Sequence, residues 1–386
     1  MRKLADKVTH FIHHHFLAIL FGAYALAVFY PMPGSMIREI SLGQISLPDQ
    51  SQLSLSVPLL MLAILLFNAG LCVKSSEFQN LLRHPALLVS GLVLNTLVPL
   101  SFALICACLS GLWHSEVEAQ NLLIGLALII SMPIAGSSSA WSQNANGNLS
   151  LSLGFVVFST LLSPLITPLG LEAISFLTDG QYALALRKLA EHGTSGFLAI
   201  GVVLPSILGV ACHFLFGEKR ISSMKSFIKL ITQIDLLILI YSNAAIALPQ
   251  AFKPFEWEFF LLIMIITTSL CLITFFIGWL VPQILKSSKA DQASMMFALG
   301  MNNNGTGLVL ASMQLAQFPL VMLPIVIYNL IQQIIAGLVD RHFFSENDQD
   351  HPESYFMGLD GSLQEKFPET SGKKDPLERS KELSRP

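Results

Sequence analysis

The stretch that decides the fold is MPIAGSSSAWSQNANGN, residues 132–148. It lies between two apolar runs, 122–131 and 149–169, and interrupts them with a proline, glycines, serines and asparagines. Polar, helix-breaking backbone is costly in hydrocarbon unless it lines a cavity or is buried in protein. A second interruption, GMNNNGTG at 300–307, also has apolar flanks. Paired broken helices at corresponding positions in two halves of a chain point to the substrate site of a transporter.

The composition is that of a membrane protein. Of the 386 residues, 53% are hydrophobic and only 12% are charged, whereas about 25% of the residues of a soluble domain are charged. Repeated apolar runs of about 20 residues are long enough to cross a bilayer as helices. We therefore predict an all-α, polytopic protein that lies in a lipid bilayer and does not bind nucleic acid.

Ten membrane spans are predicted, divided into two halves of five. They cover residues 12–31, 56–74, 85–111, 121–145, 149–175, 194–216, 226–248, 256–286, 292–316 and 317–340. The fourth span of each half carries the break. An odd number of helices in each repeat reverses the second copy in the membrane, so this order predicts two inverted five-helix repeats with crossed broken helices.

The boundaries between these segments follow from composition and charge. The predicted segments are a cytoplasmic N-terminus (1–11), a first repeat (12–175), an amphipathic interfacial linker (176–193), a second repeat (194–341) and a disordered cytoplasmic tail (342–386). Lysine and arginine are more frequent on the side of the membrane that holds both termini. That side is expected to be cytoplasmic. The protein is therefore predicted to be a multi-pass protein of the cell (inner) membrane.

Each break predicts a binding surface. A helix that starts inside a membrane presents unpaired N–H groups and the positive end of its dipole, and both favour an anion. Three consecutive serines, 137–139, are expected N-caps of the first new helix, and glycines let a ligand approach the backbone. The predicted substrate contacts are Gly136, Ser137, Asn303, Asn304, Gly305, Thr306 and, on the seventh span, Asn243. The structural alternative is that the serines and asparagines only join helices by hydrogen bonds.

At the two breaks the sequence resembles the bile acid:sodium symporter family. The matching stretches are MPIAGSSSAWSQNANGNLSLSLGFVVFSTLLSPLITPL (132–169) and FALGMNNNGTGLVLAS (297–312), and the Ser-Thr-Leu-Leu-Ser-Pro block at 159–164 is the most specific. Weaker matches extend the resemblance over most of residues 56–340. The resemblance implies ten helices in a panel (spans 1, 2, 6 and 7) and a core (spans 3–5 and 8–10). It also implies transport of organic anions such as bile acids, pantoate, keto acids or sulfonates.

The resemblance further implies sodium as the coupling ion. One sodium site would use positions that match Ser138, Ser139, Ser152 and Val156, and the other would use Asn95, the backbone of Met301, and Asn302. The glutamate that both sites share in the family is replaced here by Ala298. A hard cation prefers several oxygen ligands, including charged ones. Either sodium therefore binds at one reduced site, or coupling is different or absent.

Asp235 offers a different coupling group. It lies within the seventh span, and an acid inside a membrane span is a candidate functional site, often for protons. The alternative is that Asp235 faces water or pairs with Lys229. No histidine or cysteine stands at partner spacing to this acid, so the sequence does not predict an enzyme.

The leading hypothesis is a secondary active transporter of an organic anion that works by alternating access with sodium symport. A proton-coupled or uncoupled carrier, or a membrane sensor without transport, remains an alternative. The identity of the substrate and the oligomeric state are not predicted.

Overall fold

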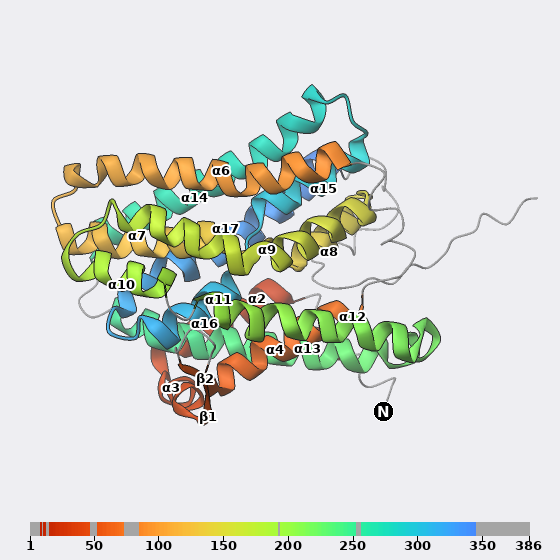
Figure 1. Cartoon of the computed structure of the whole chain (residues 1–386), viewed down its shortest axis with the longest axis horizontal. Helices are drawn as coiled ribbons and strands as arrows, with labels where there is room; N and C mark the ends of the chain where they lie inside the picture. Colours follow the sequence, from red (N-terminus) through yellow and green to blue (C-terminus); the bar gives the residue numbers. More distant parts are fainter. Residues whose placement is uncertain are drawn as a thin grey trace, which may run out of the picture.

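The structure, a computed structural model, describes residues 8–9, 11–12, 15–46, 52–72, 85–191, 194–251 and 256–344. Most of the predicted N-terminal segment 1–11 and of the predicted tail 342–386 lies outside the described residues. The described part of the chain is almost entirely helical, as the apolar composition predicts (Figure 1).

The first half of the chain contains one hairpin among its helices. The elements are α2 (Phe16–Phe29), α3 (Met32–Glu39), β1 (Ser41–Ser46), β2 (Gln52–Ser56), α4 (Val57–Leu71), α6 (Pro85–Leu109), η2 (Ser110–Leu112), α7 (Glu116–Ser131), α8 (Ser137–Asn144), α9 (Leu149–Ser175) and α10 (Gly180–Glu191). Strands β1 and β2 pair antiparallel. Helix α10 buries Tyr182, Leu186, Leu189 and Ala190 on one face, which is the pattern of an amphipathic helix, and its place as an interfacial linker between two repeats stays a prediction.

All the named elements of the second half are helices in the described residues. The elements are α11 (Thr194–Leu198), η3 (Ala199–Val203), α12 (Leu204–Phe216), α13 (Glu218–Ala251), α14 (Trp257–Ile284), α15 (Lys289–Gly300), α16 (Asn304–Gln314), η4 (Pro319–Val321), α17 (Met322–Val339) and η5 (Asp340–Phe344). Helix α15 begins with a capping box, in which Ser288 and Asp291 each bond the backbone N–H of the other. This pattern satisfies two N–H groups that a helix start leaves unpaired.

Six helices of the described residues are long and apolar enough to cross a membrane. They are Pro85–Leu112, Leu149–Ser175, Thr194–Phe216, Ser226–Pro249, Trp257–Ile284 and Pro319–Phe344, and a pair bent by 88°, Ala18–Phe29 with Met32–Glu39, makes up to seven. Helix α4 is a shorter apolar helix. These helices confirm a polytopic membrane protein. The ten spans and the inverted repeat stay predictions, because each half of a broken helix is too short to span alone.

Exposed apolar side chains cover the outer helices. On α6 they recur at Val89, Val93 and Leu97, and on α14 at Leu261 and Ile265. Residues four apart share one face of a helix, so each of these helices turns an apolar stripe outward. Large exposed apolar surfaces mark contact with a membrane or a partner, and here they fit a surrounding bilayer.

By their contacts most of the helices fall into two groups, and in Figure 1 α3, α4, α12 and α13 lie below α6, α7, α9, α14 and α15. The panel group is α2, α3, α4, α12 and α13, and the core group is α6, α7, α8, α9, α14, α15, α16 and α17. Glycines allow close packing within each group: Gly70 of α4 and Gly209 of α12 contact the backbone of each other's helix, and Gly278 of α14 lies against the backbone of Met295 and Met296. Small residues at such contacts are typical of helix packing in membranes. The two groups have the membership of the panel and core that the resemblance implies.

Candidate functional site

The two breaks cross each other inside the core group. Helix α7 stops before α8 begins, and α15 stops before α16 begins, at the positions that the sequence predicts. The extended residues between the half-helices pair as an isolated antiparallel bridge. The N–H of Ala135 donates to the carbonyl of Met301 at 2.9 Å, and the N–H of Asn303 donates to the carbonyl of Pro133 at 2.8 Å. Each break thus satisfies backbone groups of the other, which non-helical backbone at membrane depth requires.

The two new helices start differently. Asn303 caps α16, because its side-chain oxygen accepts from the N–H of Thr306 at 3.2 Å. The residue before α8 is Gly136, and no side chain caps that helix. The prediction that the serines at 137–139 are N-caps is therefore wrong. They lie within the first turn, where the hydroxyl of Ser139 donates back to the carbonyl of Gly136 at 2.7 Å. A serine in a helical first turn bonds a carbonyl behind it instead of the N–H groups ahead.

Open space borders the backbone at both helix starts. A Cβ added at Gly136 would meet no atom within 4 Å, and one at Gly305 would meet only the side-chain oxygen of Asn303, at 3.5 Å. At Gly300, by contrast, a Cβ would overlap the ring of Phe275. The first two glycines therefore leave room for a ligand, whereas the third serves helix packing.

The predicted substrate residues divide by burial. Four are partly exposed: Gly136, Ser137, Asn303 and Gly305. Asn304 and Thr306 are buried, and their side-chain polar atoms have no hydrogen-bond partner. Asn243 lies apart from the breaks, on α13 of the panel group, where its side-chain oxygen accepts from the guanidinium of Arg38 on α3.

The predicted sodium ligands include a set of unpaired oxygens. Asn95 Oδ1, Ser138 Oγ, Ser152 Oγ and Asn302 Oδ1 are each buried and without a hydrogen-bond partner. An unsatisfied buried polar group lowers the stability of a fold by about 1–3 kcal/mol. Four such oxygens in the core group therefore call for a physical explanation, such as a bound ion. Ser139 differs, since its hydroxyl is bonded within α8. The carbonyl of Met301 accepts one hydrogen bond, from the N–H of Ala135 in the first break.

Three of these side chains come from α6, α8 and α9, and Asn302 lies in the break between α15 and α16. Helix α6 packs its Gly91 against Phe155 of α9 and Met295 of α15. Asn95 lies one turn further along the same face of α6. On α9, Ser152 lies one turn before Phe155, and Ser159 lies one turn after Phe155. The hydroxyl oxygen of Ser159 accepts a hydrogen bond from the N–H of Ile134 at 3.1 Å. The face of α9 that carries Ser152 thus lies against the crossing.

Position 298 holds an alanine where the family resemblance implies a glutamate. Ala298 is fully buried in an apolar cluster with Leu151, Phe155 and Met295. Val156, the other departure in the predicted sodium set, packs against the same cluster. The residues present would therefore offer a cation neutral oxygens alone. Among the described residues, no three histidine, cysteine or acidic side chains stand together as metal ligands.

Asp235 lies in the panel group. Its side chain is 8% exposed, and Oδ2 has no partner. Nearby on α13, the Nε2 of Gln233 donates to the carbonyl of Thr9 at 3.5 Å, while the Oε1 of Gln233 is unpaired. Asp235 therefore does not face water, and the alternative that placed it in solvent is wrong.

Two residues that hold the breaks are not among those predicted from the sequence. Thr167 of α9 donates its hydroxyl to the carbonyl of Ser131, the last residue of α7, at 2.6 Å. Gln332 of α17 bonds both backbone groups of Asn302, at 3.1 and 3.2 Å. The available signal was a polar side chain within an apolar span, which marks interhelical hydrogen bonding.

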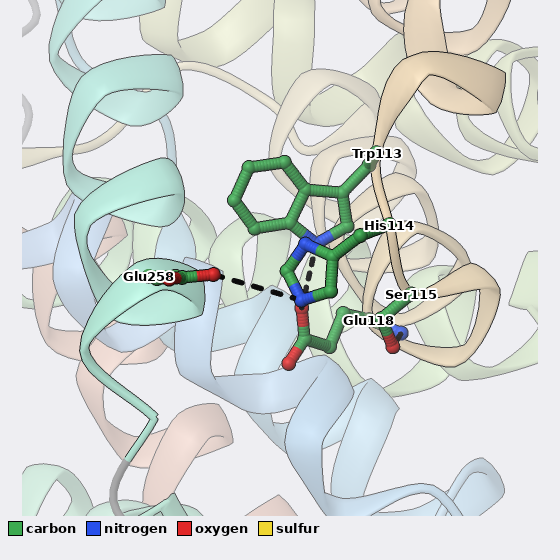
Figure 2. A network of polar contacts seen from close by, with 5 residues as sticks. All are labelled: Trp113, His114, Ser115, Glu118 and Glu258. Atoms are coloured by element: carbon green, nitrogen blue, oxygen red, sulfur yellow. Dashed lines mark hydrogen bonds and ion pairs between the residues drawn. The ribbon is translucent and has the colours of Figure 1, made fainter.

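A polar network fixes the far end of α7. The indole N–H of Trp113 donates to Glu118 at 2.6 Å, and Nε2 of His114 lies 4.0 Å from Glu118 and 3.8 Å from Glu258 of α14 (Figure 2). Ser115 caps the helix. Glu118 precedes the predicted fourth span, and burial, together with a hydrogen bond to the carboxyl of Glu256, raises the pKa of its carboxyl. The network joins the start of α7 to the start of α14, away from the crossing.

The comparisons with known proteins agree with this architecture. The model of the SBF-like CPA transporter family matches residues 14–343. The chain belongs to this family. It is 29% identical to the uncharacterized protein YbaS of Bacillus subtilis (strain 168) over 279 residues, which cover 72% of this chain and 85% of YbaS. It is 26% identical to the uncharacterized sodium-dependent transporter YocS of the same organism over 286 residues, which cover 73% of this chain and 81% of YocS.

Family membership confirms the resemblance seen in the sequence and makes the chain a multi-pass membrane transporter. It also confirms that the chain is not an enzyme.

Proposed function

We propose that this family member is a secondary active transporter that carries a small organic anion by alternating access. The observation that carries the proposal is the open backbone at Gly136 and Gly305, where two helices start within the core group. Residues 132–148 and 300–307 contain no charged side chain. Helix starts with hydroxyl and amide donors bind an anion without a fixed positive charge.

The proposed substrate site combines accessible and buried groups. Gly136, Ser137, Asn303 and Gly305 would contact the anion, because they are partly exposed. Asn304 and Thr306 contribute buried polar atoms that no protein group satisfies. The substrate class follows from the family resemblance: a bile-acid-like, keto acid, pantoate or sulfonate anion. In the proposed topology ten spans cross the cell membrane and both termini are cytoplasmic.

Sodium symport is the proposed coupling. The support is the set of four unpaired oxygens on Asn95, Ser138, Ser152 and Asn302, since side-chain oxygens are ligands of a hard cation. The name of YocS describes that relative as sodium-dependent. Without a carboxylate at position 298 the site is neutral, so sodium binding is expected to be weak unless an anion is bound beside it.

Proton coupling is the second candidate, and one observation favours it. Asp235 is the acid buried within the seventh predicted span, and one of its oxygens lacks a partner. Protonation would remove the negative charge of this buried carboxylate without a metal ion. The two candidates use different groups of helices, so substitutions separate them.

Uptake by reconstituted protein tests both candidates. We would measure entry of radiolabelled taurocholate, pantoate and pyruvate into proteoliposomes under an imposed sodium gradient, an imposed proton gradient, or neither. Sodium-driven uptake that survives Asp235→Asn and is weakened by Ser152→Ala supports sodium symport. Proton-driven uptake that Asp235→Asn abolishes supports the second candidate. Absence of flux for every anion under every gradient would contradict the transport proposal for these substrate classes.

A further inference from the structure

We propose that Tyr24, Asn329 and Gln332 form a hydrogen-bonded relay that couples the position of the panel group to the geometry of the second break. The relay rests on the proposed function, because it assigns these side chains a role in alternating access. It begins in α2, passes through α17 and ends at Asn302 between α15 and α16. Its members are positioning residues, since they act on the site through Asn302.

The inner end of the relay is the contact between Gln332 and Asn302. The N–H of Asn302 donates to Oε1 of Gln332 at 3.1 Å, and Nε2 of Gln332 donates to the carbonyl of Asn302 at 3.2 Å. The two side chains are 2% and 1% exposed. The amide of Gln332 therefore pairs with both backbone groups of one extended residue, as a neighbouring strand would.

This contact positions a predicted ligand. The Nδ2 of Asn302 donates to the carbonyl of Ile129 on α7 at 2.9 Å, while its Oδ1 has no partner. With its backbone held by Gln332 and its amide nitrogen held by α7, Asn302 has few remaining ways to turn. The direction of the free Oδ1 is thus set by groups on both sides of the crossing.

The outer end of the relay reaches the other group of helices. The Nε2 of Gln332 lies 3.4 Å from Oδ1 of Asn329, and the Nδ2 of Asn329 donates to the hydroxyl of Tyr24 at 3.2 Å. Asn329 and Gln332 are three residues apart and share a face of α17. Tyr24 belongs to α2, which packs on α13 of the panel group. The bond between Asn329 and Tyr24 therefore exists only while α2 lies against α17.

Alternating access requires the two groups to move against each other. Such a movement would break the bond to Tyr24 and leave the amide of Asn329 without that partner. The two hydrogen bonds that Nε2 of Gln332 donates, to Asn329 and to the carbonyl of Asn302, would then change in relative strength. By linkage the effect is reciprocal: a ligand that moves Asn302 changes the strength of the contact between the groups. One neutral hydrogen bond shifts an equilibrium by about twofold to twelvefold.

Distances between the groups test the relay without a substrate. Spin labels on Leu208 of α12 and Leu165 of α9, both exposed, report the separation of the panel and core groups by double electron–electron resonance. A genetically encoded ketone amino acid at each position carries the label, so the native cysteines stay in place. The proportions of the distance populations are then compared between the wild type and each variant.

Three variants and one matched control decide the result. Tyr24→Phe removes only the hydroxyl, and we expect it to shift the populations about twofold to twelvefold. Gln332→Met removes bonds that lie wholly within the core group, yet the relay predicts a shift in the same direction. The double variant should shift no further than the larger single one, because both break one chain of bonds. The control is Tyr241→Phe, whose lost bond to the carbonyl of Tyr30 stays within the panel group, and it should shift nothing.

The relay is overturned if the distance populations of Tyr24→Phe are the same as those of the wild type. This holds whether the wild type shows one population or two. Additive shifts in the double variant overturn it as well, because they mean independent packing contacts. If Gln332→Met does not fold, Asn329→Ala takes its place with the same expectation. These outcomes are separate from the proposed function: a protein that moves no anion can still show the relay, and a transporter can lack it.

Discussion

Replacing Gly136 and Gly305 by alanine separates anion binding from helix packing at the breaks. The backbone of Gly136 is helical, with φ −59° and ψ −30°, so alanine fits it without strain. An added Cβ meets nothing within 4 Å at Gly136 and makes ordinary contact with the oxygen of Asn303, at 3.5 Å, at Gly305. A compatible glycine-to-alanine change raises the free energy of unfolding by about 0.4–1 kcal/mol. Each variant should therefore be as stable as the wild type or more stable.

The expected effect on transport has the opposite sign. At each helix start the new methyl group occupies the space through which an anion approaches the backbone N–H groups. Loss of one hydrogen bond to a charged group costs about 1.5–3 kcal/mol, which corresponds to about tenfold to a hundredfold weaker binding. We expect a higher KM for the anion in each single variant and a larger increase in the double variant.

Uptake into proteoliposomes gives the KM, and thermal unfolding gives the stability of the same preparations. The matched control is Gly22→Ala in α2, where an added Cβ also meets nothing within 4 Å, and it should leave uptake unchanged. Unchanged uptake in Gly136→Ala and Gly305→Ala would contradict an anion site at these helix starts, and so would a loss of uptake that follows a loss of stability. Either result would favour the alternative in which these residues only pack helices.

Three further predictions concern side chains around the breaks and at the end of α7. Ser152→Ala should raise the sodium concentration for half-maximal uptake about tenfold or more without lowering the melting temperature, whereas Ser163→Ala, which loses a bond within its own helix, should leave sodium dependence unchanged; equal effects would count against the sodium ligand. Because the pKa of Glu118 is raised in the folded protein, its ionisation weakens the fold as pH rises through that pKa. Glu118→Gln should therefore have a higher melting temperature than the wild type at pH values above that pKa, and not at pH values below it. Melting temperatures that run parallel over the whole pH range would disprove the assignment. Asp291→Ala should lower the free energy of unfolding by about 0.3–1.5 kcal/mol, because it removes the N3 side chain of the capping box, while Asp291→Asn keeps an acceptor for the cap and should lose less; equal losses would show that the cap is not the cause.

The residues themselves predict where the helices break. Proline at 133 and the glycine–asparagine run at 300–307 place the ends of α7 and α15 correctly, because both patterns disfavour continued helix. The predicted serine cap of α8 is wrong, because three serines in a row can either cap a helix or bond within its first turn. Local sequence does not distinguish these arrangements when a glycine precedes them.

The crossing itself could not be derived from local sequence. Backbone pairing between Ala135 and Met301 joins residues 166 positions apart, and no pattern in either break specifies its partner. The same is true of Gln332, whose role depends on α17 lying beside the second break. The unpaired oxygens of Ser138 and Ser152 were indicated only by the family resemblance, because serine within an apolar helix is equally typical of a residue that bonds its own backbone.

The most direct test of the central claim is an experimental structure of the protein with a transported anion bound. Density for the anion is expected at the starts of α8 and α16, within hydrogen-bond distance of backbone N–H groups near Gly136 and Gly305. An anion held elsewhere, for example beside Arg38 and Asn243 in the panel group with both helix starts empty, would contradict it.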